Sequence, residues 1–216
     1  MKNLSVLVSL IALTLFIQPC LASINLVTPL TLSSTDIHPG DALFVYANWN
    51  ETVNSFVIEY NSTSSDLMNA TIDNNSTWTN YTIPTNSSWL LGYHSIRIYV
   101  LNPEATTDRS NFNVWGYSQS SVQLIPDNIT VSSPVTVTCR VVDANSSSPI
   151  ANYYVEATSS LEGDISSVAG LTNSSGYREG IFTPTKDGVH VITCVLDEDA
   201  TKFYTVLTNG SSNLTY

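Results

Sequence analysis

Short runs of alternating apolar and polar residues recur along this chain, separated by clusters of Gly, Pro, Asn, Asp and Ser. This period of two predicts β-strands, and almost no helical periodicity follows the first 22 residues. In the run 42–49, every second residue from Leu43 to Trp49 is apolar, so we expect these side chains to share a core-facing side. The predicted strands are 24–31, 42–49, 55–60, 67–72, 77–83, 93–101 and 111–115, then 122–125, 135–142, 152–157, 167–171, 180–183, 188–197 and 203–207.

Two sets of strands of similar length follow one another. Seven short strands in about 95 residues are typical of a β-sandwich, and the pattern occurs twice. We therefore predict an all-β chain with two tandem sandwich domains, 23–116 and 117–208, joined near 116–121 and followed by a polar tail at 209–216. The short joining segment contains no Gly/Ser run, which indicates limited hinge motion.

The first 22 residues have the pattern of a secretory signal peptide. Lys2 precedes an almost wholly apolar stretch, residues 4–17, and small residues precede the expected cleavage before Ser23. An uncleaved membrane anchor is disfavoured because the run is shorter than the roughly 20 residues needed to span a bilayer. The segment 208–216 is polar and carries no lipid-anchor signal. We expect an exported protein, secreted or at the cell surface, with no membrane span.

The charge balance is acidic and the charge density is low. The chain has 7 Lys and Arg against 18 Asp and Glu, a formal net charge of −11, and only 12% of its residues are charged. Nucleic acids and anionic lipids attract clustered cations, so neither is an expected partner. Since 43% of the residues are hydrophobic, the chain is not a disordered acidic tail. Another solubilising group is needed to cover so uncharged a surface.

N-linked glycans are the solubilising group that the sequence indicates. Twelve of the nineteen asparagines after residue 22 stand in Asn-x-Ser/Thr, against roughly five expected by chance at this Ser/Thr content. Glycans are bulky and solubilising, and they must point into solvent. The acceptors are Asn50, Asn61, Asn69, Asn74, Asn75, Asn80, Asn86, Asn128, Asn145, Asn173, Asn209 and Asn213. An alternative is that an Asn/Ser/Thr-rich chain forms sequons by accident.

Two details follow from strand alternation and sequon spacing. Asn74 and Asn75 belong to overlapping sequons, so sterics should let only one of them carry a glycan. Trp78 and Asn80 share one face of the predicted strand 77–83, and both must face solvent if Asn80 is glycosylated. We hypothesise that Trp78 stacks on a glycan of its own chain. The alternative is that it caps the edge of the sandwich.

Once the signal peptide removes Cys20, two cysteines remain, Cys139 and Cys194. In an oxidising compartment they most simply form one disulfide. Two free thiols or a metal pair are less favoured, because no other Cys or His lies at ligand spacing from either residue.

Four segments of the second half carry a family resemblance. The segments 134–145, 149–155, 171–177 and 182–193 resemble the opening strands, mid-domain turn and closing hairpin of bacterial and archaeal Ig-like surface domains. The resemblance covers 118–208 and extends more weakly to 24–116 through 92–100. It implies two tandem Ig-like β-sandwiches, with the cysteines on the second and penultimate strands, where an inter-sheet disulfide would sit. Unlike antibody domains, the chain has no Trp between the cysteines and has Ile192 two residues before the second.

Candidate catalytic chemistry is sparse. No nucleophile elbow, Cys-His pair or zinc-binding HExxH occurs, so we predict a non-enzyme without cofactor or metal. The histidines, His94 and His190 above all, are expected to make strand-end hydrogen bonds. The run 197–199 reads as a solvated acidic turn, with a weak Ca²⁺ site as the alternative. Three further tryptophans, at 49, 89 and 115, are expected in the core or rim of a sandwich rather than in a carbohydrate platform.

The arrangement resembles glycosylated extracellular filament subunits made of Ig-like domains. An apolar strand opens the mature chain, and such a strand can add to a neighbour's open sheet edge, giving a head-to-tail homopolymer. The strand-donating residues would be Ile24, Leu26, Val27 and Leu30. The alternative for this segment is the first strand of its own domain. The alternative for the protein is a monomeric adhesin or a carbohydrate- or protein-binding Ig-like module.

Overall fold

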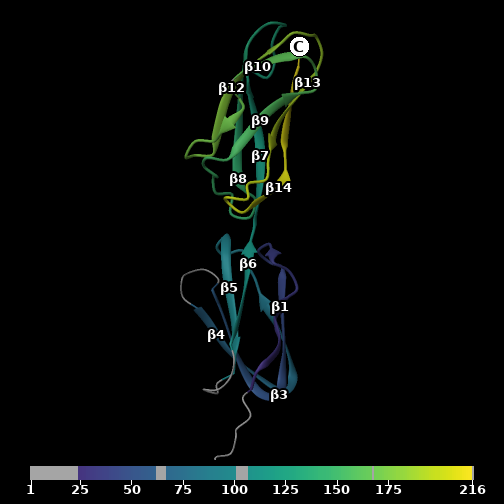
Figure 1. Cartoon of the computed structure of the whole chain (residues 1–216). Helices are drawn as coiled ribbons and strands as arrows, with labels where there is room; N and C mark the ends of the chain where they lie inside the picture. Colours follow the sequence, from purple (N-terminus) through teal and green to yellow (C-terminus); the bar gives the residue numbers. More distant parts are fainter. Residues whose placement is uncertain (1–23, 62–66, 101–106, 167, 216) are drawn as a thin grey trace, which may run out of the picture.

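The computed structural model describes residues 24–61, 67–100, 107–166 and 168–215, and every regular element in these ranges is a β-strand. The strands form two sandwich units stacked end to end (Figure 1). Each unit has its own hydrophobic cluster, one built from residues between Leu30 and Val114 and the other from residues between Leu124 and Leu214. The all-β prediction is confirmed. The predicted signal peptide, residues 1–22, lies outside the described residues.

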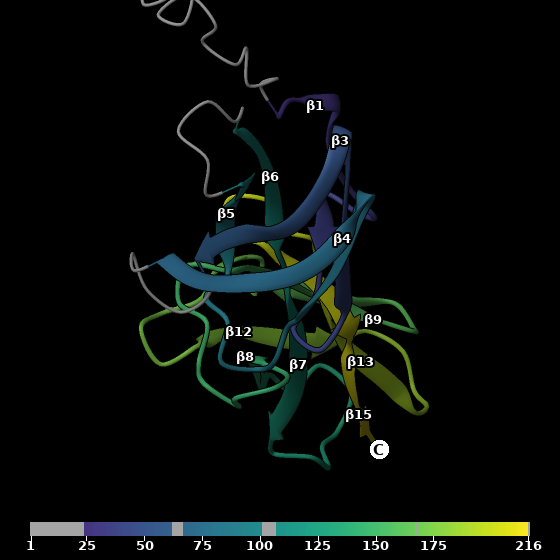
Figure 2. The ribbon, with the colours of Figure 1, turned by 90° about the horizontal axis from the view of Figure 1, so that it is seen from below.

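The first unit is organised around a long, bent hairpin. The hairpin strands β3 and β4 run side by side as two curved ribbons (Figure 2). The first part of β3 pairs with β1, and its last residues pair with β5, so β3 belongs to both faces of the sandwich. The strands of this unit are β1 (Leu26–Leu32), β2 (Asp36–Ile37), β3 (Ala42–Asn61), β4 (Leu67–Pro84), β5 (Gly92–Tyr99) and β6 (Asp108–Val114).

The sequence predicted four strands where the hairpin has two. The breaks expected near residues 50–54 and 73–76 are continuous strand, with the pairing register shifting between Asn48 and Ser55. Such irregularities bend a strand and increase its twist. The polar residues that indicated a loop therefore mark the place where β3 and β4 bend from one layer of the sandwich into the other.

The alternation along β3 sorts its side chains as predicted. Every second residue from Leu43 to Trp49 is buried, whereas Phe44 and Tyr46 between them are exposed. On β4, Thr79 and Ile83 are buried, and Trp78 and Asn80 face solvent. The two strands thus place one face in the core and the other in water, as half-buried antiparallel strands do.

The second unit has two sheets in the strand order of an Ig-like sandwich. One sheet runs β10-β12-β8-β7-β14 and the other runs β11-β9-β13-β15. In the first sheet β7, β8, β12 and β10 are neighbours in the order of strands A, B, E and D of Ig constant-type domains, and in the second β9, β13 and β15 follow the order of strands C, F and G. The strands are β7 (Gly116–Ile125), β8 (Val135–Asp143), β9 (Tyr154–Ser159), β10 (Gly163–Ser166), β11 (Gly170–Leu171), β12 (Tyr177–Pro184), β13 (His190–Leu196), β14 (Tyr204–Thr208) and β15 (Gly210–Leu214).

Two sequence predictions about segment boundaries are wrong. The expected linker 116–121 is the first half of β7, which pairs with β8 and, in parallel, with β14. The expected polar tail 209–216 contains β15, which pairs with β13 from His190 to Cys194. β15 was not predicted because Leu214 is its only buried residue, so the segment shows no alternation of apolar and polar positions. No pattern of alternating apolar and polar residues predicted the short strands β2 and β10.

Candidate functional site

The sequon asparagines lie almost entirely on the outside of the molecule. Ten of the twelve have described side chains, and nine of these are exposed: Asn50, Asn75, Asn80, Asn86, Asn128, Asn145, Asn173, Asn209 and Asn213. Asn74 is half-buried, and the side chains of Asn61 and Asn69 are outside the described part. Solvent exposure is the geometric requirement for an attached glycan. The predicted acceptors therefore form a candidate glycan-acceptor surface over both units.

The overlapping pair Asn74 and Asn75 is resolved by hydrogen bonding. The Nδ2 atom of Asn74 donates to the carbonyl oxygen of Ser76 at 2.8 Å. Asn75 is exposed, with a positive φ of 67° that Asn tolerates better than most residues. Because a glycan is joined to Nδ2, the geometry favours Asn75 as the acceptor.

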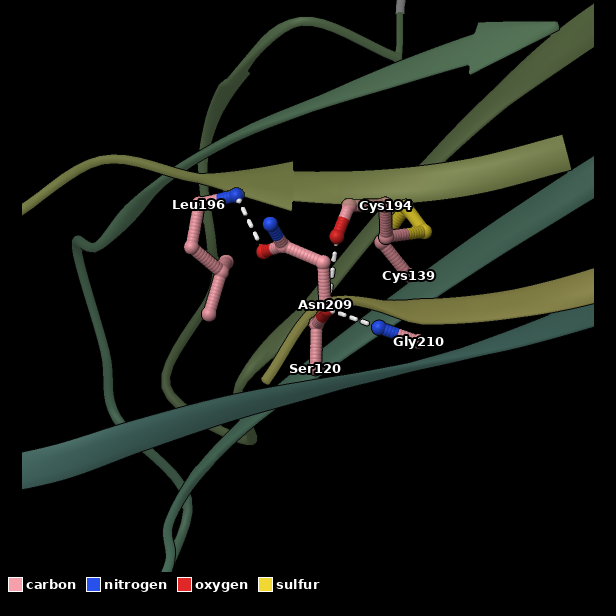
Figure 3. Close-up of a disulfide and its surroundings, with 6 residues drawn as sticks. All are labelled: Ser120, Cys139, Cys194, Leu196, Asn209 and Gly210. Atoms are coloured by element: carbon pink, nitrogen blue, oxygen red, sulfur yellow. Dashed lines mark hydrogen bonds between the residues drawn. A yellow bond between two sulfur atoms is a disulfide. The ribbon is translucent and has the colours of Figure 1, made fainter. Parts of the chain in front are cut away.

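At Asn86, Asn173 and Asn209 the side-chain oxygen, not the amide nitrogen, takes part in the local structure. Asn86 Oδ1 accepts from the Ser88 backbone N–H at 2.9 Å, and Asn173 Oδ1 accepts from the Tyr177 N–H at 3.0 Å. Asn209 Oδ1 accepts from the Leu196 N–H at 2.9 Å (Figure 3). These bonds hold each side chain by the atom that does not carry a sugar.

The two cysteines form the predicted disulfide, between β8 and β13 in opposite sheets. Their Cα atoms are 5.8 Å apart, and both residues are fully buried. Beside the disulfide, Ser120 Oγ donates to the Cys194 carbonyl at 2.6 Å and accepts from the Gly210 N–H at 2.9 Å (Figure 3). Ser120 thus connects β7 to β13 and β15, two adjacent strands of the opposite sheet.

The predicted strand-donating segment pairs with its own unit in this single chain. β1 pairs with β3, with register shifts between Leu26 and Thr28 and between Thr28 and Thr31. Leu30 is the one buried side chain of β1. Ile24 and Leu26 pack partly against the core, and Val27 is 59% exposed. Donation of this strand to another subunit remains a prediction.

A cluster of aromatic rings, which we call the joint, connects the two units. The His38 ring stacks on Tyr117 with ring centroids 4.1 Å apart, and His38 Nε2 lies 3.1 Å from Thr205 Oγ1. Phe203 meets Tyr93 edge-on at 4.8 Å and Trp115 at 5.5 Å. Offset and edge-to-face pairs of this kind are favourable beyond their buried area.

Backbone contacts and a glycine tighten the joint. The Gly116 N–H donates to the Phe203 carbonyl at 2.7 Å. A Cβ at Gly116 would lie 2.6 Å from the Tyr204 ring, so a larger residue would force this ring or the Leu91 side chain to move. These contacts explain why a chain without a flexible linker crosses directly from β6 to β7.

Asp36 organises the first unit's side of the joint. Its Oδ1 accepts hydrogen bonds from Asn113 Nδ2 at 2.7 Å and Trp115 Nε1 at 2.9 Å. These donors, Asn113 first, lower the pKa of the Asp36 carboxyl below its usual value. The carboxylate thereby orients the Trp115 indole toward Phe203. The sequence did not single out Asp36, which stands in a polar segment with no recognisable motif.

The residues considered for chemistry have structural surroundings. His94 and His190 are buried and bond the carbonyls of Leu90 and Lys186, four residues earlier, as predicted for strand-end histidines. Trp49 and Trp89 are buried, so they are core residues rather than a sugar platform.

The acidic turn 197–199 is held by hydrogen bonds from the residues that follow it, Thr201 and Lys202. Burial opposes ionisation of Asp199, but hydrogen bonds from Thr201 and Lys202 outweigh it and lower the pKa of the carboxyl. Within the described ranges, no three His, Cys, Asp or Glu side chains are grouped closely enough to bind a metal ion. None of the described segments is a helix long and apolar enough to cross a bilayer.

No protein-family model matches the chain, and no curated protein matches it in sequence. Among solved structures, the D0-D1 domain of intimin matches with TM-score 0.35 and 15% identity, covering 88% of this chain and 99% of that one. The Yersinia pseudotuberculosis adhesin InvE matches with TM-score 0.42 and 14% identity over 87% and 58%. A two-domain fibronectin type III segment of chicken tenascin matches with TM-score 0.48 and 11% identity over 88% and 98%. Similarity at these levels carries no information on function.

Proposed function

We propose that this chain is a non-enzymatic, N-glycosylated extracellular protein with a structural or adhesive role at the cell surface. The observation that carries the proposal is the exposure of nine of the ten sequon asparagines with described side chains. Only 12% of the residues are charged, so carbohydrate is the natural means of solvating such a surface.

The placement of the sequons on sheet edges supports this proposal. β4 pairs with β3 alone, and β15 pairs with β13 alone, so each of these strands has an outer edge without a strand partner among the described residues. Asn69, Asn75 and Asn80 lie on β4, and Asn213 lies on β15. Open edges promote aggregation by pairing with other chains. Glycans on these strands would block such pairing.

Expression with its N-terminal segment in a glycosylating secretory host tests the proposal. Intact mass of the secreted protein should fall after N-glycosidase treatment, and peptide mapping should find Asn75 occupied and Asn74 bare. Secreted protein with the mass of bare polypeptide would refute the proposal. Occupancy of Asn74 with Asn75 bare in the wild-type peptide map would refute the choice between the two acceptors only.

A second, finer candidate is a filament subunit that donates β1 to a neighbour. Its support is the irregular pairing of β1, which has two register shifts with β3 and one buried side chain, Leu30. A strand that leaves its own sheet loses its contacts with the core, but it regains the same contacts in an identical neighbour. Donation between identical subunits is head-to-tail and gives open fibres.

A cysteine pair distinguishes the two pairings without removing the strand. Thr28 and Asn48 are register partners on β1 and β3. The double variant T28C/N48C should give a ladder of disulfide-linked oligomers on a non-reducing gel if β1 is donated, with T28C alone as the control. Cross-linked monomers at every concentration would exclude donation and leave the adhesin alternative. That alternative expects a monomer that retains a ligand on a glycan array.

A further inference from the structure

Three exposed aromatic residues form a patch on the outer face of the β3–β4 hairpin. Phe44 is 43% exposed, Tyr46 39% and Trp78 62%. Phe44 and Tyr46 are two residues apart on β3, and Trp78 lies on the adjacent part of β4. Single exposed aromatic residues are common on proteins, but contiguous apolar patches mark surfaces that something covers.

A sequon lies in the middle of this patch. Asn80 is the direct register partner of Tyr46, and Thr82, which completes the sequon, is the partner of Phe44. Directly opposed side chains have Cβ atoms about 5 Å apart. Trp78 is two residues before Asn80 on the same face, about 7 Å along the strand. The acceptor amide therefore has an aromatic ring opposite it and another beside it.

The surface between these residues is hollowed. A depression of about 290 Å³ is lined by Tyr46, Trp78 and Asn80, together with residues where β4 bends, among them Asp73 and Asn74. A pyranose has an apolar C–H face that suits an aromatic ring and a hydroxyl rim that suits polar groups. The depression offers both, and Asn80, the residue to which the first sugar would be joined, is part of its lining.

We propose that the patch of Phe44, Tyr46 and Trp78 is a platform for the chain's own glycan at Asn80, whose first pyranose rings pack on Tyr46 and Trp78. The proposal rests on the glycosylation proposed above and adds a defined contact for one glycan. A tethered sugar is always near its platform, so even a weak contact is populated. Such a glycan would cover apolar surface and exclude a second protein from lying flat on this face.

Tryptophan accessibility tests the platform. Trp78 is the most exposed tryptophan, Trp115 is half-buried at the joint, and Trp49 and Trp89 are 2% and 6% exposed, so a change in acrylamide quenching caused by the Asn80 glycan reports on Trp78. Glycosylated wild type should be quenched less than Asn80→Gln. The matched control Asn173→Gln, an exposed sequon in the second unit, should behave like wild type. In a Trp78→Phe background the difference between Asn80 and its Gln variant should disappear.

Two further arms define the contact. Trimming every glycan to its first sugar with endoglycosidase should preserve part of the protection, because the first sugar is one of those held over the rings, and complete loss of protection would exclude a contact by the first sugar. Tyr46→Ala should lower the melting temperature more in the protein that carries the Asn80 glycan than in the Asn80→Gln background. The reason is that the substitution removes a ring–sugar contact only where the glycan is present.

The outcomes separate this inference from the proposed function. Unchanged quenching in Asn80→Gln, with Asn80 shown by mass spectrometry to be occupied in wild type, would overturn the platform. So would an unoccupied Asn80 beside other occupied sequons, or protection that increases with protein concentration, which would indicate a second copy on the patch. Bare asparagines at every sequon would overturn the proposed function itself.

Discussion

Removal of the Cys139–Cys194 disulfide should destabilise the second unit and leave the first unchanged. The two residues are 55 positions apart, and they join opposite sheets of one sandwich. Closing a loop of 55 residues lowers the entropy of the unfolded chain enough to stabilise the fold by about 4 kcal/mol in the chain-entropy model. The double variant C139A/C194A should lose about that much, because both sites are fully buried and alanine fits them without a polar group.

The distribution of tryptophan makes the two units separately observable. All four tryptophans, at 49, 78, 89 and 115, precede β7. Tryptophan fluorescence therefore mainly follows unfolding of the first unit, with Trp115 also sensing the loss of its contact with Phe203 in the second unit, whereas far-UV circular dichroism follows both units. For a slope of about 3 kcal/mol per molar guanidinium, a loss of about 4 kcal/mol lowers the midpoint of the second unit by about 1.3 M.

The expected result is one shifted transition in circular dichroism and an unshifted tryptophan transition. An equal shift of the tryptophan transition would show that the two units unfold as one body, and the separate hydrophobic clusters would then be the wrong description. A loss below about 1 kcal/mol would show that the unfolded chain is already compact around these cysteines.

Three other substitutions test the contacts described above. Phe203→Ala removes the ring that contacts Tyr93 and Trp115, so NMR relaxation should report different rotational correlation times for the two units, and equal values would refute the proposed role of the joint. Glu59 is 6% exposed, and its carboxylate accepts hydrogen bonds from Arg97 Nε at 2.8 Å and Tyr99 Oη at 2.6 Å. Glu59→Gln should therefore lower the unfolding free energy of the first unit by about 2 kcal/mol. Guanidinium unfolding at pH 7 should show this loss and no change in the second unit. Hydrogen bonds lower the pKa of the Asp36 carboxyl in the folded protein. The stabilisation that Asp36 contributes is therefore present above the usual carboxyl pKa of about 4 and is lost as the pH falls through the lowered pKa. We expect the unfolding midpoint to decrease less between pH 5 and pH 3 in Asp36→Asn than in wild type.

The sequence alone determined that the chain is built of β-strands, which faces of the predicted strands enter the core, and the disulfide. Alternation is a local property, so the burial of Leu43 and Trp49 and the exposure of Trp78 follow from a few neighbouring residues. With Cys20 assigned to the signal peptide, Cys139 and Cys194 had no other expected partner. The exposure of most sequon asparagines was also predictable, because polar residues in turns and on outward strand faces lie in solvent.

Only the tertiary structure decided which distant segments meet. Tyr46 is opposite Asn80 because of the register of β3 on β4, and no local pattern encodes that register. The polar segment of β15 became a strand because β13 offered it an open edge. Phe203 reached Trp115 because the second unit folds its last strands beside β7. Hydrogen bonds and ring contacts between residues far apart in sequence depend on the whole chain packing, so they could be observed but not predicted.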